Sequence, residues 1–182
     1  MIGQIIIIRE LIVIFYGNEL SLGVTLASWL FWISSGSFLA SRLVSRLKLG
    51  EKALSNIHVI SFILLPLNII LIRNIKSILN IPAGKIIGLM PMLGSSFLSL
   101  APICLLFGFT FTLISKLSSE KTELPSREIG NVYMIEGLGA AIGGLFFSFI
   151  KLLSPFQNIL IIAGLNLIAA LLVKRNASHV GL

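Results

Sequence analysis

The chain has 182 residues, of which 56% are hydrophobic and 12% charged, and its mean hydropathy is +1.02. This composition excludes a soluble globule of the same size, because too few polar side chains remain to cover its surface, and it predicts a lipid environment. The net charge of +7 does not indicate nucleic acid, because the basic residues lie mostly in short segments between apolar runs. In such segments Lys and Arg set membrane topology and contact lipid headgroups.

The apolar runs predict an all-α, polytopic transmembrane bundle. A helix needs about 20 apolar residues to cross the hydrocarbon, so the chain has room for about six spans in a single membrane domain covering residues 1–182. The expected spans are 1–16, 20–40, 54–72, 97–116, 131–153 and 157–173.

The connections differ in character along the chain. Residues 1–16 are short for a span, and we interpret them as the back part of a first helix, since the small residues of a signal-peptide cleavage site are missing. The segment 74–95 is broken by polar residues and prolines and is expected to lie at the interface. Residues 117–128 are strongly hydrophilic and belong in water, and a tight turn at Ser154 and Pro155 joins the last two spans.

Counting Lys and Arg gives the orientation. One side of the predicted bundle has nine basic residues and the other has four, so the first side should be cytoplasmic, with both termini facing inward. The nine are Arg42, Arg46, Lys48, Lys52, Lys116, Lys121, Arg127, Lys174 and Arg175, and the four are Arg73, Lys76, Lys85 and Lys151.

Three charged residues fall inside predicted spans: Arg9, Glu10 and Glu136. A charge in the hydrocarbon costs about 2.5–3.5 kcal/mol on insertion scales, so each requires a partner or a water-filled site. Arg9 and Glu136 are expected at similar depths, which makes an interhelical pair one hypothesis. The alternative is that Arg9 extends to the headgroups and that Glu136 is protonated or water-exposed. Glu10 is a poor partner for Arg9, because adjacent residues on a helix do not face each other.

The span 131–153 is the most distinctive segment. Its small residues recur at helical spacing and predict a close approach of another helix. These are Gly137, Ala140, Ala141 and Gly144. Tyr133 precedes Glu136 by one turn, and a substrate path lined by these two residues is the alternative to simple packing.

Catalytic chemistry finds no support in the sequence. Asp is absent, His58 and His179 lie far apart, and no HExxH, GxSxG or Walker-type motif occurs. The single cysteine, Cys104, lies in an apolar run and suits packing better than metal binding. We therefore expect no catalytic residues, no metal and no cofactor.

Four stretches resemble one family, the membrane domain fused to spermidine synthase-like (polyamine aminopropyltransferase-like) enzymes of many bacteria. The stretches are REL at Arg9 to Leu11, GNELSLGVTLASWLFWISSGSFLASR from Gly17 to Arg42, LAPICLLFGFTF from Leu100 to Phe111, and GNVYMIEGLGAAIGGLFFSF from Gly130 to Phe149. The resemblance implies a bundle loosely similar to half of a major facilitator transporter, in the bacterial cytoplasmic (inner) membrane. The aminopropyltransferase-like soluble domain that follows in the family is not seen after Arg175, which leads us to expect a fragment or split subunit.

Two functions follow as expectations. The first is a non-catalytic membrane domain that anchors or partners a spermidine synthase-like enzyme or subunit, with the lipid bilayer as its other partner. The second is a transporter-like bundle, working alone or as an oligomer such as a dimer, that moves a small solute along a polar path near Glu136.

Overall fold

The structure, a computed structural model, describes residues 2–82, 85, 87–120, 124–149 and 154–180. Within these residues the chain is all-α, as predicted, with seven helices and no strand. The helices are α1 (Ile2–Ile14), α2 (Glu19–Leu47), α3 (Glu51–Arg73), α4 (Ile75–Ile78), α5 (Leu89–Ser119), α6 (Pro125–Phe149) and α7 (Pro155–Val180).

Four helices are long and apolar enough to cross a membrane within the described residues: α2, α3, α5 and the segment Phe156–Arg175 of α7. Four such helices are typical of an integral membrane protein. Their exposed faces agree with this, because α2 buries a stripe that includes Ser21, Thr25, Ser28 and Gly36 while exposing large side chains such as Leu30 and Phe38. Small and polar residues inside with large apolar ones outside is an arrangement suited to lipid.

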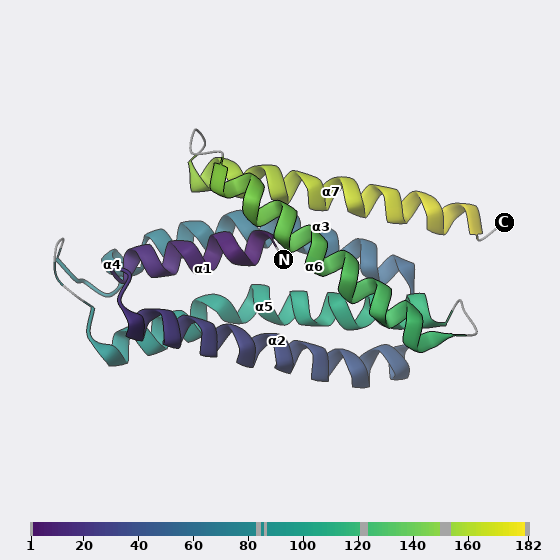
Figure 1. The fold of residues 1–182 in the computed structure, drawn as a ribbon, viewed down its shortest axis with the longest axis horizontal. Helices are drawn as coiled ribbons and strands as arrows, with labels where there is room; N and C mark the ends of the chain where they lie inside the picture. The colour runs from purple at the N-terminus through teal and green to yellow at the C-terminus, as the bar shows by residue number, and fades with distance from the viewer. Residues whose placement is uncertain (1, 83–84, 86, 121–123, 150–153, 181–182) are drawn as a thin grey trace.

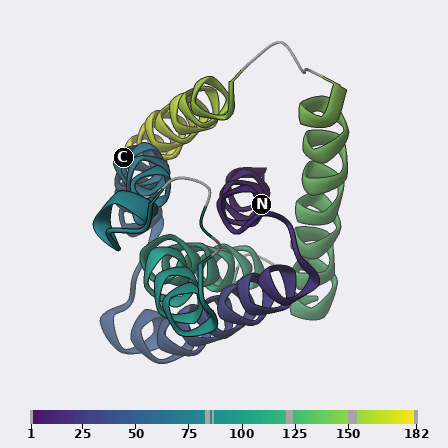
Figure 2. The same ribbon diagram turned by 90° about the vertical axis from the view of Figure 1, so that its left-hand side faces the viewer.

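Helices α2, α3, α5 and α7 run in similar directions, α6 crosses them obliquely, and α1 lies among them (Figure 1). Viewed from one end, α1 is surrounded by α2, α3, α5, α6 and α7 (Figure 2), and it contacts all five. Ile7 and Leu11 of α1 are fully buried and Phe15, just after it, nearly so. These residues lie on the side of α1 that faces the other helices, whereas Ile5, Arg9 and Val13 lie on its exposed side.

Helices α2 and α5 approach each other most closely at two glycines. A Cβ atom added at Gly36 would lie 2.9 Å from the Cα atom of Leu105, and one added at Gly108 would lie 3.0 Å from the backbone nitrogen of Ser37. The Ser37 hydroxyl donates a hydrogen bond to the Gly108 carbonyl (3.1 Å), and the Trp32 indole donates one to the Phe97 carbonyl (2.8 Å). The pairing runs in the same chain direction on both helices, so α2 and α5 are parallel. Small residues, Gly36 and Ser37 of α2 and Gly108 of α5, thus form the close part of this contact.

Helix α7 packs antiparallel against α3. The Ser55 hydroxyl donates to the Ala170 carbonyl (2.9 Å), and one turn further along α3 His58 meets Asn166. The start of α7 is fixed by a capping box: the Gln157 amide nitrogen donates to the Ser154 hydroxyl (3.3 Å) and the Ser154 amide nitrogen donates to the Gln157 side chain (2.8 Å).

The helix bounds differ from the predicted spans, mainly because of proline. Pro91 lies in the first turn of α5, where the missing N–H has no helical partner to lose, so the helix begins at Leu89 instead of at residue 97. Pro125 in the same way opens α6 six residues before the predicted span. The segment 74–95 is therefore divided between the short helix α4, a loop and the start of α5.

The two predicted groups of basic residues lie at opposite ends of the bundle, except that Lys121 and Lys151 fall outside the described residues. Arg42, Arg46 and Lys116 lie where α2 and α5 end, and the Lys116 ammonium donates to the Ser45 hydroxyl (3.4 Å). Arg73 and Lys76 lie at the other end, by α4 (Figure 1). The asymmetry of charge is thus a property of the folded bundle as well as of the sequence.

The glycine contact predicts a strong effect of a single methyl group. Gly108→Ala places a Cβ against the backbone of α2, which side-chain rotation cannot relieve, so we expect it to lower the free energy of unfolding by about 1–3 kcal/mol. Gly94→Ala is the matched control, because it lies in the same helix with open space at its Cβ position; helix propensity there favours alanine by up to about 1 kcal/mol.

Thermal unfolding of the detergent-solubilised variants measures this difference. Both tryptophans of the chain, Trp29 and Trp32, lie in α2, so their fluorescence reports on the α2–α5 contact. Equal midpoints for the two variants would contradict the role assigned to Gly108.

Candidate functional site

A cavity of about 560 Å³ lies between α1, α3, α5, α6 and α7. Its wall is mostly apolar, with aromatic rings from Phe107 and Phe111 of α5 and aliphatic side chains from α6 and α7. The polar side chains that line it are His58, Thr110, Ser118, Glu136 and Asn166. The volume is that of a pocket for a small organic molecule, and apolar walls with a few polar groups are typical of such pockets.

Glu136 supplies the only carboxylate among the lining residues that the structure describes. It lies on α6 and is intermediate in exposure, and no hydrogen-bond or ion-pair partner for it occurs among the described residues. Gly139, one turn further along α6, also lines the cavity. Glu136, near which the sequence predicts a polar path, therefore does line a pocket, and this pocket is partly open to the exterior.

His58 and Asn166 form a hydrogen-bonded pair in the cavity wall. The Asn166 amide NH₂ donates to the Ile162 carbonyl (2.9 Å), which leaves the Asn166 carbonyl oxygen facing the His58 Nδ1 atom at 3.1 Å. Because that oxygen can only accept, Nδ1 carries the proton of this bond. A neutral His58 then has an unprotonated Nε2, which is a hydrogen-bond acceptor.

Thr110 completes the polar wall on α5. Its hydroxyl donates to the Leu106 carbonyl one turn earlier (2.7 Å), so its proton is used within the helix. The oxygen lone pairs stay available to a bound molecule.

Of the other residues predicted for the site, Glu10 is buried and pairs with Arg73 of α3. The Arg73 Nε atom donates to the Glu10 carboxylate at 3.1 Å, and the Glu10 side chain is only 9% exposed against 42% for Arg73. Arg9 points to the opposite side of α1 and is exposed. The hypothesis of an ion pair between Arg9 and Glu136 is not realised in the described structure.

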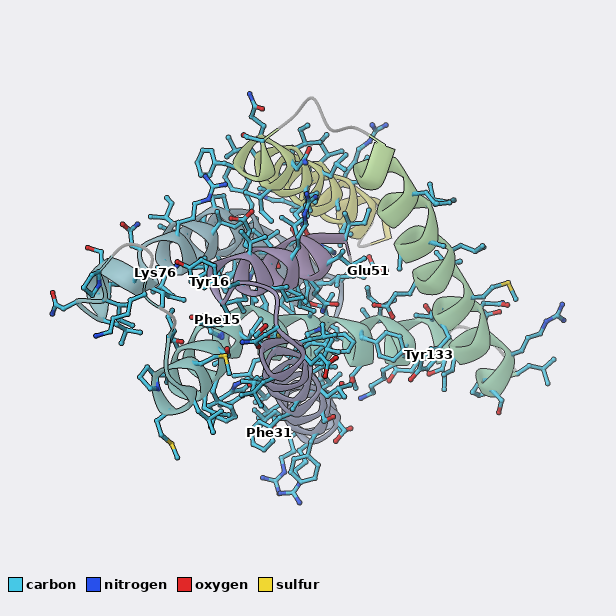
Figure 3. The ribbon with its side chains drawn as sticks, turned by 60° about the vertical axis from the view of Figure 1, so that its left-hand side comes forward. Phe15, Tyr16, Phe31, Glu51, Lys76 and Tyr133 are labelled. Atoms are coloured by element: carbon cyan, nitrogen blue, oxygen red, sulfur yellow. The ribbon has the colours of Figure 1, made fainter. Side chains whose placement is uncertain are left out.

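A second contact links the same two parts of the chain. The Lys76 ammonium lies 4.0 Å from the centre of the Tyr16 ring, and these two residues lie next to each other beyond α1 and α3 (Figure 3). A cation over an aromatic face is attracted by the ring quadrupole. The end of α1 is therefore joined to the end of α3 by one ion pair and one cation–π contact.

Tyr133 lies outside the cavity lining. Its side chain is 63% exposed, and its ring packs edge-on against Phe111 of α5, with ring centres 4.7 Å apart. Figure 3 shows it on α6 beside α5. Phe111 does line the cavity, so Tyr133 supports the wall from behind instead of forming it.

Among the described residues, the small residues of α6 show a close helix contact only at Gly143. A Cβ added at Gly137 or Gly144 would meet nothing within 4 Å, whereas one added at Gly143 would meet the Ile2 side chain. Ala141 is exposed and Ala140 intermediate. Gly143, which was not among the predicted positions, therefore makes the close contact between α6 and α1, and packing through Gly137, Ala140, Ala141 and Gly144 stays a prediction.

His58, Asn166 and Thr110 were not predicted for the site. His58 and Asn166 are 108 residues apart, and each appears in its own segment as a single polar residue in an apolar helix. A single polar residue in each of several apolar spans could have indicated these positions. Only the pairing of α3 with α7, however, brings His58 and Asn166 together.

The chain matches no protein-family model, no curated protein and no solved structure. The resemblance to the spermidine synthase-like membrane domain therefore stays a prediction. The cavity itself provides the strongest argument about function.

The Glu10–Arg73 pair predicts an unequal response to removing either partner. Arg73→Gln leaves the buried Glu10 carboxylate without its counter-charge, and we expect a loss of about 1–3 kcal/mol in the free energy of unfolding, typical of an unsatisfied buried group. Glu10→Gln leaves a half-exposed guanidinium that water solvates, so its cost should be smaller. Arg9→Gln serves as the control on the exposed side of α1.

Unfolding midpoints of the three variants in detergent test the order. A loss for Arg9→Gln as large as that for Arg73→Gln would show that the ion pair is not the source of the stability.

Proposed function

We propose that this protein is a transporter-like membrane bundle that binds a small, mostly apolar solute in the cavity around Glu136. The observation that carries the proposal is the cavity of about 560 Å³, which combines apolar walls with one acidic side chain, Glu136. An ionisable residue facing an internal space in a membrane protein is a functional candidate, because burying it without a use is costly. The absence of a catalytic motif from the sequence agrees with binding rather than chemistry.

We further propose six membrane crossings, with α1 and α6 embedded beside the four long apolar helices, and both termini cytoplasmic in a bacterial inner membrane. The charge asymmetry between the two ends of the bundle supports this orientation. Helix α1 spans only about 20 Å, from 13 residues at 1.5 Å each, but it contacts five other helices and exposes only one side, which includes Ile5, Arg9 and Val13.

The sequence resemblance supports a second role, in which the bundle anchors or partners a spermidine synthase-like enzyme. The two roles are compatible, because a solute bound in the membrane domain can be delivered to an attached enzyme. A glycine-rich aminopropyltransferase-like domain encoded beside this chain would favour the second role.

Filling the cavity tests the proposed function. Three probes of nearly equal size, 1-naphthylmethanol, 1-naphthylmethylamine and 1-naphthoic acid, are dialysed against the protein in lipid nanodiscs, with empty nanodiscs to subtract partitioning into lipid. We expect saturable binding of at least one probe, and Gly139→Leu should weaken it by about tenfold, or about 1.4 kcal/mol.

Gly137→Leu is the matched control, since it adds the same side chain to the same helix at a position that does not line the cavity and has open space. The proposed function is wrong if no probe binds saturably, or if both leucine variants bind as the wild type does.

Cysteine labelling tests the orientation. In a Cys104→Ser background, Ser77→Cys of α4 should react with a membrane-impermeant maleimide added to intact spheroplasts, whereas Lys52→Cys at the start of α3 should react only after permeabilisation. Both positions are exposed, and Cys104 is fully buried. The reverse pattern would overturn the orientation.

A further inference from the structure

Most of the polar groups that line the cavity can accept hydrogen bonds; the second N–H of the Asn166 side chain is an exception, because it is a donor. The Glu136 carboxylate, the unprotonated Nε2 of a neutral His58 and the lone pairs of Thr110 are acceptors, and the donors of the last two residues are already used by Asn166 and Leu106. Ser118 has a hydroxyl that can turn either way. No Lys or Arg occurs among the lining residues that the structure describes.

A cavity with one carboxylate and two fixed acceptors is complementary to a cationic donor. A primary ammonium group has three N–H donors and one positive charge, so it can pair with the Glu136 carboxylate and also donate to the neutral acceptors that line the cavity. Hydrogen bonds between an ionised donor and an ionised acceptor are about twice as strong as those between neutral groups. A neutral alcohol offers a single donor, and a carboxylate would meet Glu136 with the same charge.

The remaining lining residues of the cavity indicate the chemical character of the rest of the ligand. Phe107, Phe111, Ile135 and Leu165 present apolar surface, and the two aromatic rings also attract a cation. Because the described lining has one carboxylate only, a molecule with several ammonium groups would bring charges into an apolar space without partners, at a cost of several kcal/mol per ion. A metal ion would likewise lack ligands, since a Zn²⁺ site uses three or four protein donors.

We infer that the solute is an organic monoamine, a protonated amino group on an apolar body, with Glu136 as its counter-ion and His58 and Thr110 as hydrogen-bond acceptors. This inference rests on the proposed function, because it names the ligand of the same cavity. His58 acts here through the tautomer that Asn166 fixes.

The three naphthyl probes test the inference, because they share an apolar body and differ in their head groups. In wild-type protein, 1-naphthylmethylamine should bind at least about tenfold more tightly than 1-naphthylmethanol, and 1-naphthoic acid should bind most weakly. Glu136→Gln should remove the preference for the amine and leave binding of the alcohol unchanged, while Glu136→Asp, which keeps the charge, should retain much of the preference.

The outcomes separate this inference from the proposed function. If the alcohol binds as tightly as the amine in the wild type, and Gly139→Leu still weakens both, the cavity binds solutes but the monoamine inference is wrong. Tighter binding of spermidine than of 1-naphthylmethylamine would also overturn it. If Glu136→Gln fails to assemble, the order of the three probes on the wild-type protein decides by itself.

Discussion

The close approach of α2 and α5 at Gly36 and Gly108 is the contact on which the rest of the bundle depends. It fixes α5, and the other sides of α5 then hold three further helices. Asn68 of α3 donates to the Ser99 carbonyl (2.6 Å), Phe111 receives the Tyr133 ring of α6, and α1 packs in the middle. Thr110, between these contacts, faces the cavity. Helix α5 thus contacts the core helices and also contributes a polar residue to the cavity wall.

Much of this arrangement follows from the sequence, and the rest depends on pairing between distant segments. Composition and apolar runs predict an all-α membrane protein. The start of α5 lies before the predicted span because Pro91 was interpreted as an interruption and not as a residue of the first helical turn. The start of α6 lies before the predicted span because Pro125 belongs to a hydrophilic stretch that was assigned to water. Hydropathy does not distinguish a proline in the first turn of a helix from a proline that interrupts a helix. The position of the proline relative to the apolar run does distinguish the two cases.

The candidate site, too, was predicted from the sequence only in part. Glu136 was identified because a carboxylate in an apolar span is costly, and the structure does place it on a cavity. Its proposed partner Arg9 was chosen from depth alone, whereas rotation around the α1 axis decides what a side chain meets: Glu10 turns toward Arg73 and Arg9 turns outward. The depth of a side chain along its helix can be predicted from its residue number. The direction in which it points around the helix axis depends on the neighbouring helices. For the same reason, the sequence did not predict that His58 and Asn166 contribute to the site.

The parallel pairing of α2 with α5 has a consequence for biogenesis. Ser37 and Gly108 are 71 residues apart, so at roughly 5–20 residues per second the ribosome makes the partner of α2 about 4–14 s after α2 itself. During that interval Ser35 and Ser41 can bond within α2, to the Phe31 and Phe38 carbonyls. Ser37 and Trp32, in contrast, find their acceptors on α5, so the hydrogen bonding of α2 is completed only after α5 has been inserted.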